Sequence, residues 1–349
     1  MTILSIDTSC DETAAALTDN TTVLSNIVWS QAADHAKFGG VMPSLAKRMH
    51  EERIDWVIEK ALLSAGKKVG DINAVAVTTG PGLSIALGVG VEKAKEMAKK
   101  ANVPLIPINH VEAHLLSPLS QPKPKNRNNK SKTVSKFPAF GLVVSGGNTI
   151  FVLLNGVGSY KVLAETQDDA LGEALDKAAR MLGLGYPGGA IFEKMAAKGN
   201  LNAFSLPVPL LGQENRQIFS YSGLKTSFYR LIESQKAKDP NFPSKTDTYN
   251  LAATFQNAAF THIERVVSHI IKTKESSAGD FYLGGGVAAN VELRKRLRAI
   301  CRKHGLTFRV PYIKRLCGDN AAMVGVCAFL NPKFIDPEKI DRDPNVKLL

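Results

Sequence analysis

The chain has 349 residues, a formal net charge of +12, 44 % hydrophobic residues and only 7 % aromatic residues. This length predicts two domains, because single domains usually span about 100–200 residues, and the composition excludes a wholly disordered chain. The four scattered cysteines exclude a disulfide scaffold and favour a reducing compartment. Acidic residues close to the N-terminus argue against a signal peptide or membrane anchor, so we expect a cytoplasmic protein without membrane contact. The positive charge favours an anionic partner, either nucleic acid or phosphorylated metabolites.

Two segments with the same plan indicate an internal repeat. Residues 3–19 and 139–156 each contain an apolar strand, a turn of small polar residues and a second strand. The second turn, Ser145-Gly146-Gly147-Asn148, has two glycines that allow backbone N–H groups to face an anion. Each hairpin is expected to open a domain.

Strands and helices alternate after each hairpin. The periodicity predicts strands over 74–79, 105–108, 161–166 and 280–283, and helices over 43–65, 84–100, from about 109, 170–182, 190–197, 248–272, 291–302 and 319–330. This alternation in two similar halves predicts two α/β domains that face each other across a cleft.

Composition sets the domain boundaries. We predict an N-terminal α/β domain over 1–120, a C-terminal α/β domain over 137–330 and a loosely packed tail over 331–349. Residues 121–136 contain six basic residues and no acidic ones, which predicts a flexible basic linker or surface loop. Part of the helix over 319–330 is expected to pack back on the first domain.

Two histidines at helical spacing form a candidate metal-binding pair. His110 and His114 are four residues apart, which places both imidazoles on one helix face, whether or not a metal binds there. The zinc-protease signature H-E-x-x-H does not fit. Glu112 follows the first histidine by two residues, about 200° round the helix, and so points away from any metal.

Asp319 is the best candidate for a third metal ligand. It is an acidic residue at the start of an otherwise apolar helix, where its alternative role is that of an N-cap. Cys317 could also ligate a metal, although a small buried residue is the commoner role for such a cysteine.

Glycine-rich turns and one carboxylate suggest a nucleotide site. The turns SGGNT and GGGVAAN occur in the repeated α/β frame and are suited to phosphate approach. Asp176 is either a solvated charge or a partner for a ribose hydroxyl.

At this level of detail the sequence resembles the TsaD family. Nine motifs carry the resemblance, in the family's order and between residue 3 and about 330: IDTSCDETAAAL, FGGVMPSLAKRMH, TTGPGLSIALGVG, NHVEAHLLSP, VVSGGNT, DDALGEALDKAARMLGLGYPGG, FSYSGLKT, LGGGVAANVELR and CGDNAAM. The form is similar to the bacterial branch. The resemblance implies two similar domains of the acetate and sugar kinase, heat-shock ATPase and actin superfamily, facing across a cleft.

The resemblance also implies an activity. It is transfer of a threonylcarbamoyl group from threonylcarbamoyl-AMP to the exocyclic amine of the adenosine 3′ of the anticodon, in tRNAs reading codons that begin with A. His110, His114 and Asp319 would then hold one divalent metal, taken as iron in the family, with zinc as the alternative.

Further site residues follow from the matched motifs. The donor would be contacted by Val143, Val144, Ser145, Gly146, Gly147, Asp176, Gly189 and Asn290. Asp11 and Glu12 match an acidic pair close to the transferred group, and one of them is the candidate general base. Two positions depart from the family pattern: Asn148 replaces the usual histidine, and Asp7 replaces the usual glutamate.

The resemblance implies tRNA as substrate, and as partners a paralogous TsaB-like subunit and a TsaE-like ATPase. Alternatives remain: an ATP-dependent phosphotransferase or ATPase of the same superfamily, a metalloprotease, or a scaffold that binds tRNA without catalysis. Residues 294–315 hold nine basic residues and no acidic ones, so without this segment and 121–136 the chain has a net charge of −3. We predict that at least one of these segments contacts the tRNA backbone.

Overall fold

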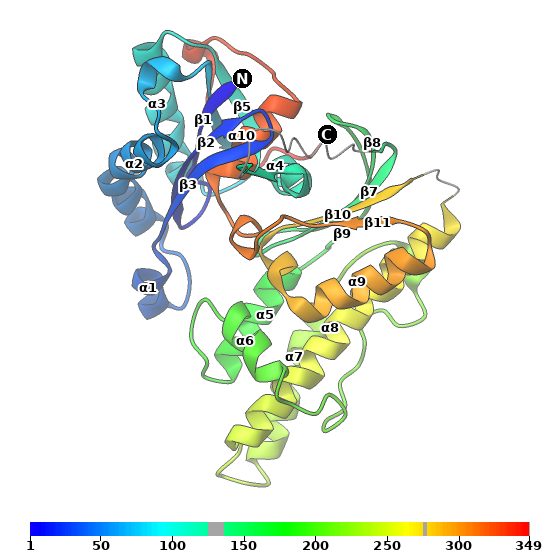
Figure 1. The fold of residues 1–349 in the computed structure, drawn as a ribbon. Coiled ribbons are helices and arrows are strands. Elements are labelled where there is room, and N and C mark those ends of the chain that lie inside the picture. The colour runs from blue at the N-terminus through cyan, green and yellow to red at the C-terminus, as the bar shows by residue number, and fades with distance from the viewer. Residues whose placement is uncertain (125–135, 275–277, 349) are drawn as a thin grey trace.

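Two sheets built on the same plan form the framework of the protein (Figure 1). The computed structural model describes residues 1–124, 136–274 and 278–348. The first sheet has the strand order β5-β4-β1-β2-β3-β6, and its strands are β1 (Thr2–Asp7), β2 (Glu12–Asp19), β3 (Thr22–Ser30), β4 (Ala74–Gly80), β5 (Leu105–Asn109) and β6 (Gln121–Pro122). The second has the order β11-β10-β7-β8-β9, and its strands are β7 (Ala139–Val144), β8 (Thr149–Gly156), β9 (Ser159–Glu165), β10 (Asp280–Gly284) and β11 (Thr307–Arg309).

The strand directions confirm the internal repeat. In the first sheet β1 pairs antiparallel with β2 and parallel with β4, and in the second β7 pairs antiparallel with β8 and parallel with β10. The third antiparallel strand (β3 or β9) and the outer parallel strand (β5 or β11) also correspond. Both predicted hairpins therefore occupy the same place in their sheets.

Ten α-helices cover these sheets in the described part of the chain. They are α1 (Ala32–His35), α2 (Pro43–Ala65), α3 (Ser84–Ala101), α4 (His110–Leu116), α5 (Leu171–Met181), α6 (Gly189–Ala196), α7 (Ser222–Lys236), α8 (Lys245–Thr273), α9 (Val291–Lys303) and α10 (Ala321–Leu330). All eight predicted helices are present, while α1, α7, β3, β6 and β11 were not predicted. Helix α7 buries only Leu224, Phe228 and Ile232. Because this apolar stripe is one residue wide, its periodicity in the sequence is weak.

The first sheet is buried on both faces, and α10 covers the face toward the second sheet. Leu4 and Ile6 of β1 pack with residues of α2 and α3, whereas Ile3 packs on the α10 side. The Ser5 hydroxyl donates to the Ala321 carbonyl at 2.6 Å. Figure 1 shows α10 and α4 between the two sheets, with α5 to α9 beyond the second. Since one apolar cluster joins α4, α10, β7 and β8, the two halves share a core.

Residues 331–348, predicted as a loosely packed tail, are mostly exposed but are anchored to the first half at several points. Ile340 is buried in the core of the first sheet, and the Ile335 amide donates to the Leu105 carbonyl. The Asp343 amide donates a hydrogen bond to the Thr79 carbonyl, and the Asn109 side chain donates one to the Lys347 carbonyl. Backbone groups and two apolar side chains thus anchor a segment whose composition is polar.

The domain limits at 120 and 137 stay a prediction. Most of the basic segment, 125–135, lies outside the described residues. None of the described helices is long and apolar enough to cross a membrane.

His262 of α8 makes stability depend on pH. Its Nε2 accepts a hydrogen bond from the Ser220 amide at 3.2 Å, and burial lowers its pKa from 6.5 to about 4. The unfolded chain therefore takes up this proton first as the pH falls. We expect the free energy of unfolding to decrease by about 3 kcal/mol between pH 6.5 and 4 from this group alone. Denaturant titrations of the wild type and His262→Gln should show a weaker pH dependence in the variant. The same pH dependence in both would contradict this assignment.

Candidate active site and metal centre

The two predicted metal-binding histidines lie at the start of α4. The helix begins directly after β5 because the Asn109 side chain caps it, accepting hydrogen bonds from the Val111 and Glu112 amides at 2.9 and 3.1 Å. His110 and His114 are both buried, with ring centroids 4.6 Å apart. The i, i+4 spacing therefore produces the adjacent imidazoles that the sequence predicts.

Glu112 lies on the other face of the same helix. Its Oε1 accepts hydrogen bonds from the Tyr160 hydroxyl at 2.6 Å and the Asn331 amide at 3.0 Å. The prediction that Glu112 points away from a metal is confirmed. A protease mechanism with Glu112 as general base is therefore excluded by this geometry.

Asp319 reaches the histidine pair from the loop before α10. Its Oδ1 lies 3.1 Å from Nε2 of His114 and 3.6 Å from Nε2 of His110. The alternative role of Asp319 as helix N-cap is wrong, because Asn320 caps α10 and accepts from the Met323 amide at 3.1 Å. Asp319 is left with its carboxylate directed at the imidazoles.

Cys317 is not part of this cluster. It is fully buried, and its Sγ accepts a hydrogen bond from Arg294 at 3.0 Å. The interpretation of Cys317 as a small buried residue is confirmed.

The electrostatics of the cluster suit a metal ion. Burial and the neighbouring His110 lower the pKa of His114, so its imidazole is neutral at physiological pH. Burial alone would raise the pKa of Asp319, but His110 and the hydrogen bond to His114 lower it to about 2. A neutral imidazole and an ionised carboxylate are the protonation states that metal ligation requires.

The positions of the donor atoms also fit one ion. The three candidate ligand atoms lie within 4.8 Å of one another. Ligands of one transition metal at about 2.0–2.2 Å are separated by roughly 3–3.5 Å, close to the 3.1 and 3.6 Å between Asp319 Oδ1 and the two histidine Nε2 atoms. Both histidine Nδ1 atoms are buried without a hydrogen-bond partner among the described residues.

Asp7 is a neighbour of this cluster that the sequence did not assign to it. Its Oδ2 lies 3.8 Å from Nδ1 of His110, and burial raises its pKa. Ligating histidines commonly have a carboxylate on their second nitrogen, which makes Asp7 a candidate positioning residue. The place of Asp7 could have been expected from the first hairpin, because Asp7 is the last residue of β1, before the polar turn of the motif IDTSCDET.

A cavity of about 630 Å³ opens beside the candidate metal ligands His110 and Asp319. It is lined by Asp11, Glu12 and His110 from the first half, by the turn Ser145–Asn148 from the second, and by Asp319. Burial raises the pKa of Glu12, and the nearby Asp319 and Asp11 raise it further. The structure thus brings the predicted acidic pair, glycine turn and metal cluster together.

A second cavity, of about 260 Å³, continues the first. Both are lined by Gly146, Asp176, Pro187 and Gly286. Asp176, Gly189 and Asn290, the other predicted donor-binding residues, surround the second cavity, with Leu175 and Val287 as apolar walls. An apolar pocket with a few polar groups is typical of a nucleoside site.

The polar groups of this second cavity are fixed by hydrogen bonds. Asp176 Oδ1 accepts from the Gly188 and Gly189 amides, both at 2.9 Å, and so holds the start of α6. Asn290 caps α9 and donates to Gln256 at 2.9 Å. Neither side chain is a freely solvated surface group.

Val143 and Val144 line neither cavity. Their side chains are buried in the cores on either side of the second sheet. The turn after β10 touches their strand: Gly285 has φ +92°, and a Cβ there would lie 2.2 Å from the Val144 carbonyl oxygen. Only glycine permits this approach, which brings Gly286 to the cleft. A direct role of the two valines in donor binding stays a prediction.

Lys177 and Arg180 of α5 also line the first cavity, and neither was predicted as a site residue. Arg180 donates to the Gly39 carbonyl at 2.8 Å, across the cleft. Lys177 is paired with Asp169 and Glu173, both at 2.7 Å. The signal was available in the long motif DDALGEALDKAARMLGLGYPGG, where only Asp176 was singled out.

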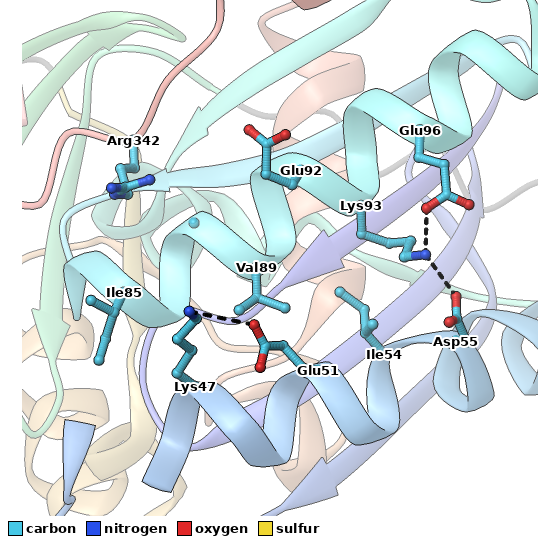
Figure 2. A pocket seen from close by; sticks show the side chains of 11 residues that line it. Lys47, Glu51, Ile54, Asp55, Ile85, Val89, Glu92, Lys93, Glu96 and Arg342 are labelled. Atoms are coloured by element: carbon cyan, nitrogen blue, oxygen red, sulfur yellow. Dashed lines mark hydrogen bonds and ion pairs between the residues drawn. The ribbon is translucent and has the colours of Figure 1, made fainter. Parts of the chain in front are cut away.

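A further cavity, of about 620 Å³, lies between α2 and α3 and carries no such chemistry (Figure 2). Its walls hold surface ion pairs, Lys47 with Glu51 at 3.6 Å and Lys93 with Asp55 at 3.0 Å. No histidine or cysteine is among the described residues that line it. The candidate active site is therefore the cleft beside α4.

Comparisons with known proteins agree with this geometry. The family model described as TsaD, tRNA N6-adenosine threonylcarbamoyltransferase, matches residues 22–326. The chain belongs to the TsaD family. The tRNA N6-adenosine threonylcarbamoyltransferase of Trichlorobacter lovleyi is 41 % identical over 328 residues, covering 93 % of this chain and 90 % of that protein. That of Pelobacter propionicus is 42 % identical, covering 93 % and 91 %.

Among solved structures, this TsaD family member is similar to full-length HypF in a phosphate- and nucleotide-bound form. The TM-score is 0.55 at 14 % identity, covering 94 % of this chain and 54 % of that one. This likeness concerns the fold alone and agrees with the predicted arrangement of two similar α/β halves.

Substitutions on the two faces of α4 should affect metal binding differently. His110→Ala and His114→Ala should weaken binding of a divalent metal by at least on the order of 100-fold, because each removes a ligand. Glu112→Gln, on the same helix, should retain the metal because Glu112 faces Tyr160 and Asn331. Elemental analysis of the purified variants measures this directly. Metal loss in Glu112→Gln, or retention in both histidine variants, would contradict the assignment.

Proposed function

We propose that the chain transfers the threonylcarbamoyl group from threonylcarbamoyl-AMP to the N6 amine of the adenosine 3′ of the anticodon, in tRNAs that read codons beginning with A. The observation that carries this proposal is one continuous cleft, in a TsaD family chain, that joins a metal cluster, an acidic pair and a glycine turn.

The donor fits the two cavities in one orientation. Its adenosine would occupy the second cavity, between Leu175 and Val287, with Asp176 at the ribose. Its phosphate would meet the backbone of Gly146 and Gly147, where a Cβ would meet no atom within 4 Å and space is therefore open. The threonylcarbamoyl group would then extend into the first cavity, toward Asp319 and Glu12.

The metal would be held by His110, His114 and Asp319, and we infer iron, with zinc as the alternative. When bound, it supplies Lewis-acid stabilisation for the negative charge that develops as AMP leaves. Asp7 would keep the His110 ring oriented.

The acceptor amine needs help, because its lone pair is delocalised into the adenine ring. Reaction therefore depends on the activated mixed anhydride and on close positioning of the amine. Glu12 is the candidate base. Its pKa is raised toward the pH at which the enzyme works, and a base of this kind is better able to take up the amine proton. The adenine must be turned out of the anticodon loop to reach it.

The alternatives are less well supported. A phosphotransferase or ATPase would have no use for the buried cluster of two histidines and a carboxylate. A scaffold that binds tRNA without catalysis would need neither this cluster nor the acidic pair. The metalloprotease hypothesis lacks a general base on the metal face of α4.

We further propose that the chain acts with a TsaB-like paralogue and a TsaE-like ATPase. The cytoplasmic location likewise stays a prediction. Transfer measured with and without these proteins would show whether the chain is sufficient by itself.

Transfer should require both donor and metal cluster. With threonylcarbamoyl-AMP, unmodified tRNA and the partner proteins, the wild type should form threonylcarbamoyladenosine, detected by mass spectrometry of digested tRNA. His110→Ala and His114→Ala should lose this activity, while His269→Ala on α8 should keep it. The absence of modified adenosine with the wild type would overturn the proposed function. ATP turnover by the isolated chain that survives the histidine substitutions would favour the alternative.

Glu12→Gln should lower kcat by about 100-fold or more, because it removes the proton acceptor. Metal content and donor binding should stay near those of the wild type. Glu173→Gln is the matched control, since Glu173 lines the same cavity and pairs with Lys177. Single-turnover transfer rates decide the comparison. Equal rates for Glu12→Gln and Glu173→Gln would exclude Glu12, and a loss confined to Asp11→Asn would assign the base to Asp11.

A further inference from the structure

Some basic residues of the segment 294–315 have interaction partners within the fold, and others do not. Arg296 bonds to Glu264 at 3.0 Å and Glu292 at 2.9 Å, and Arg309 pairs with the buried Asp280 at 2.9 Å. Arg294 bonds to the Ala288 carbonyl and to Cys317. These arginines hold α9 and β11 in the second half of the fold.

The remaining cations of α9 also have local explanations. Lys295 lies 3.7 Å from Glu292, and the Arg298 guanidinium lies 5.3 Å from the Phe308 ring centroid. Arg302 and Lys303 occupy the last turn of α9, where positive charge is stabilised by the helix dipole.

Lys314 and Arg315 lie outside α9. They form the short turn after β11, both are exposed, and neither has an acidic partner within the described ranges. Tyr312 and Ile313 directly before them are also exposed, by 39 % and 46 %. An aromatic ring, an aliphatic side chain and two unpaired cations thus occupy four consecutive exposed positions, Tyr312–Arg315.

Two buried residues follow this exposed segment and lead directly to Asp319. Leu316 is buried against Ala14 and Ala16 of β2, and Cys317 is fully buried. Gly318 and Asp319 follow at once and line the cleft. The two cations therefore lie four and five residues before Asp319, where the chain passes from the second sheet to α10 (Figure 1).

We propose that Tyr312–Arg315 is a contact surface for the anticodon loop of the RNA substrate, an inference that rests on the proposed function. Lys314 and Arg315 would bind backbone phosphates, and the Tyr312 ring would stack on an unpaired base beside the adenosine that enters the cleft. Unpaired cations next to an exposed aromatic ring are suited to single-stranded nucleic acid, because phosphates and base faces alternate along it.

The test uses the full-length, metal-loaded chain and an anticodon stem-loop RNA, with fluorescence anisotropy read over a range of salt concentrations. Lys314→Ala/Arg315→Ala should weaken binding about tenfold at low salt and reduce the slope of log K against log salt by about 2, one for each lost phosphate contact. Arg302→Ala/Lys303→Ala removes the same charge from the same segment and should leave the slope unchanged.

Tyr312 provides an independent readout. Tyr312→Leu should weaken binding without changing the salt slope, and Tyr312→Phe should restore the affinity, because stacking needs the ring and not the hydroxyl. Equal salt slopes for the two double variants would overturn the proposal, as would a loss confined to binding of a partner protein. The assay contains no donor and records no transfer, so a failure of the proposed function is separate from a failure of this surface.

Discussion

The contact between Asp319 and His114 is the constraint on which the site depends. It joins residues 205 positions apart, at a distance of 3.1 Å. The contact forms because α4 and α10 are packed against each other in the core shared by the two sheets. Each helix is capped by an asparagine, Asn109 or Asn320, which fixes where it begins and hence where its ligand lies. Packing that buries apolar side chains therefore also assembles the metal centre.

The duplicated sheet explains how one cleft combines different chemistries. Each half contributes the turn of its first hairpin, and both turns face the same cavity. In the first half this turn carries Asp11 and leads into Glu12 at the start of β2, and in the second it carries Gly146 and Gly147. One turn therefore offers carboxylates for proton transfer and the other offers backbone N–H groups for a phosphate. The same local plan serves two purposes because the turns carry different residues.

Much of this arrangement could be predicted from local signals. The hairpins, the long helices and the i, i+4 histidines depend on periodicity and spacing, and all are confirmed. The position of Glu112 followed from helix geometry alone. The role of Asn320 as cap was missed because Asp319 and Asn320 are both good N-caps, and only the backbone decides between them. The docking of Ile335 and Ile340 was missed because two apolar residues in a polar tail give no periodic signal.

The division of the basic segment could not be predicted either, because charge counts do not show which cations are paired inside the fold. X-ray absorption spectroscopy of the metal-loaded protein would identify the ligands of the metal. We expect two imidazole nitrogens and one carboxylate oxygen at about 2.0–2.2 Å from the metal. A sulfur ligand at about 2.3 Å, as Cys317 would supply, or a shell without imidazole would contradict this expectation.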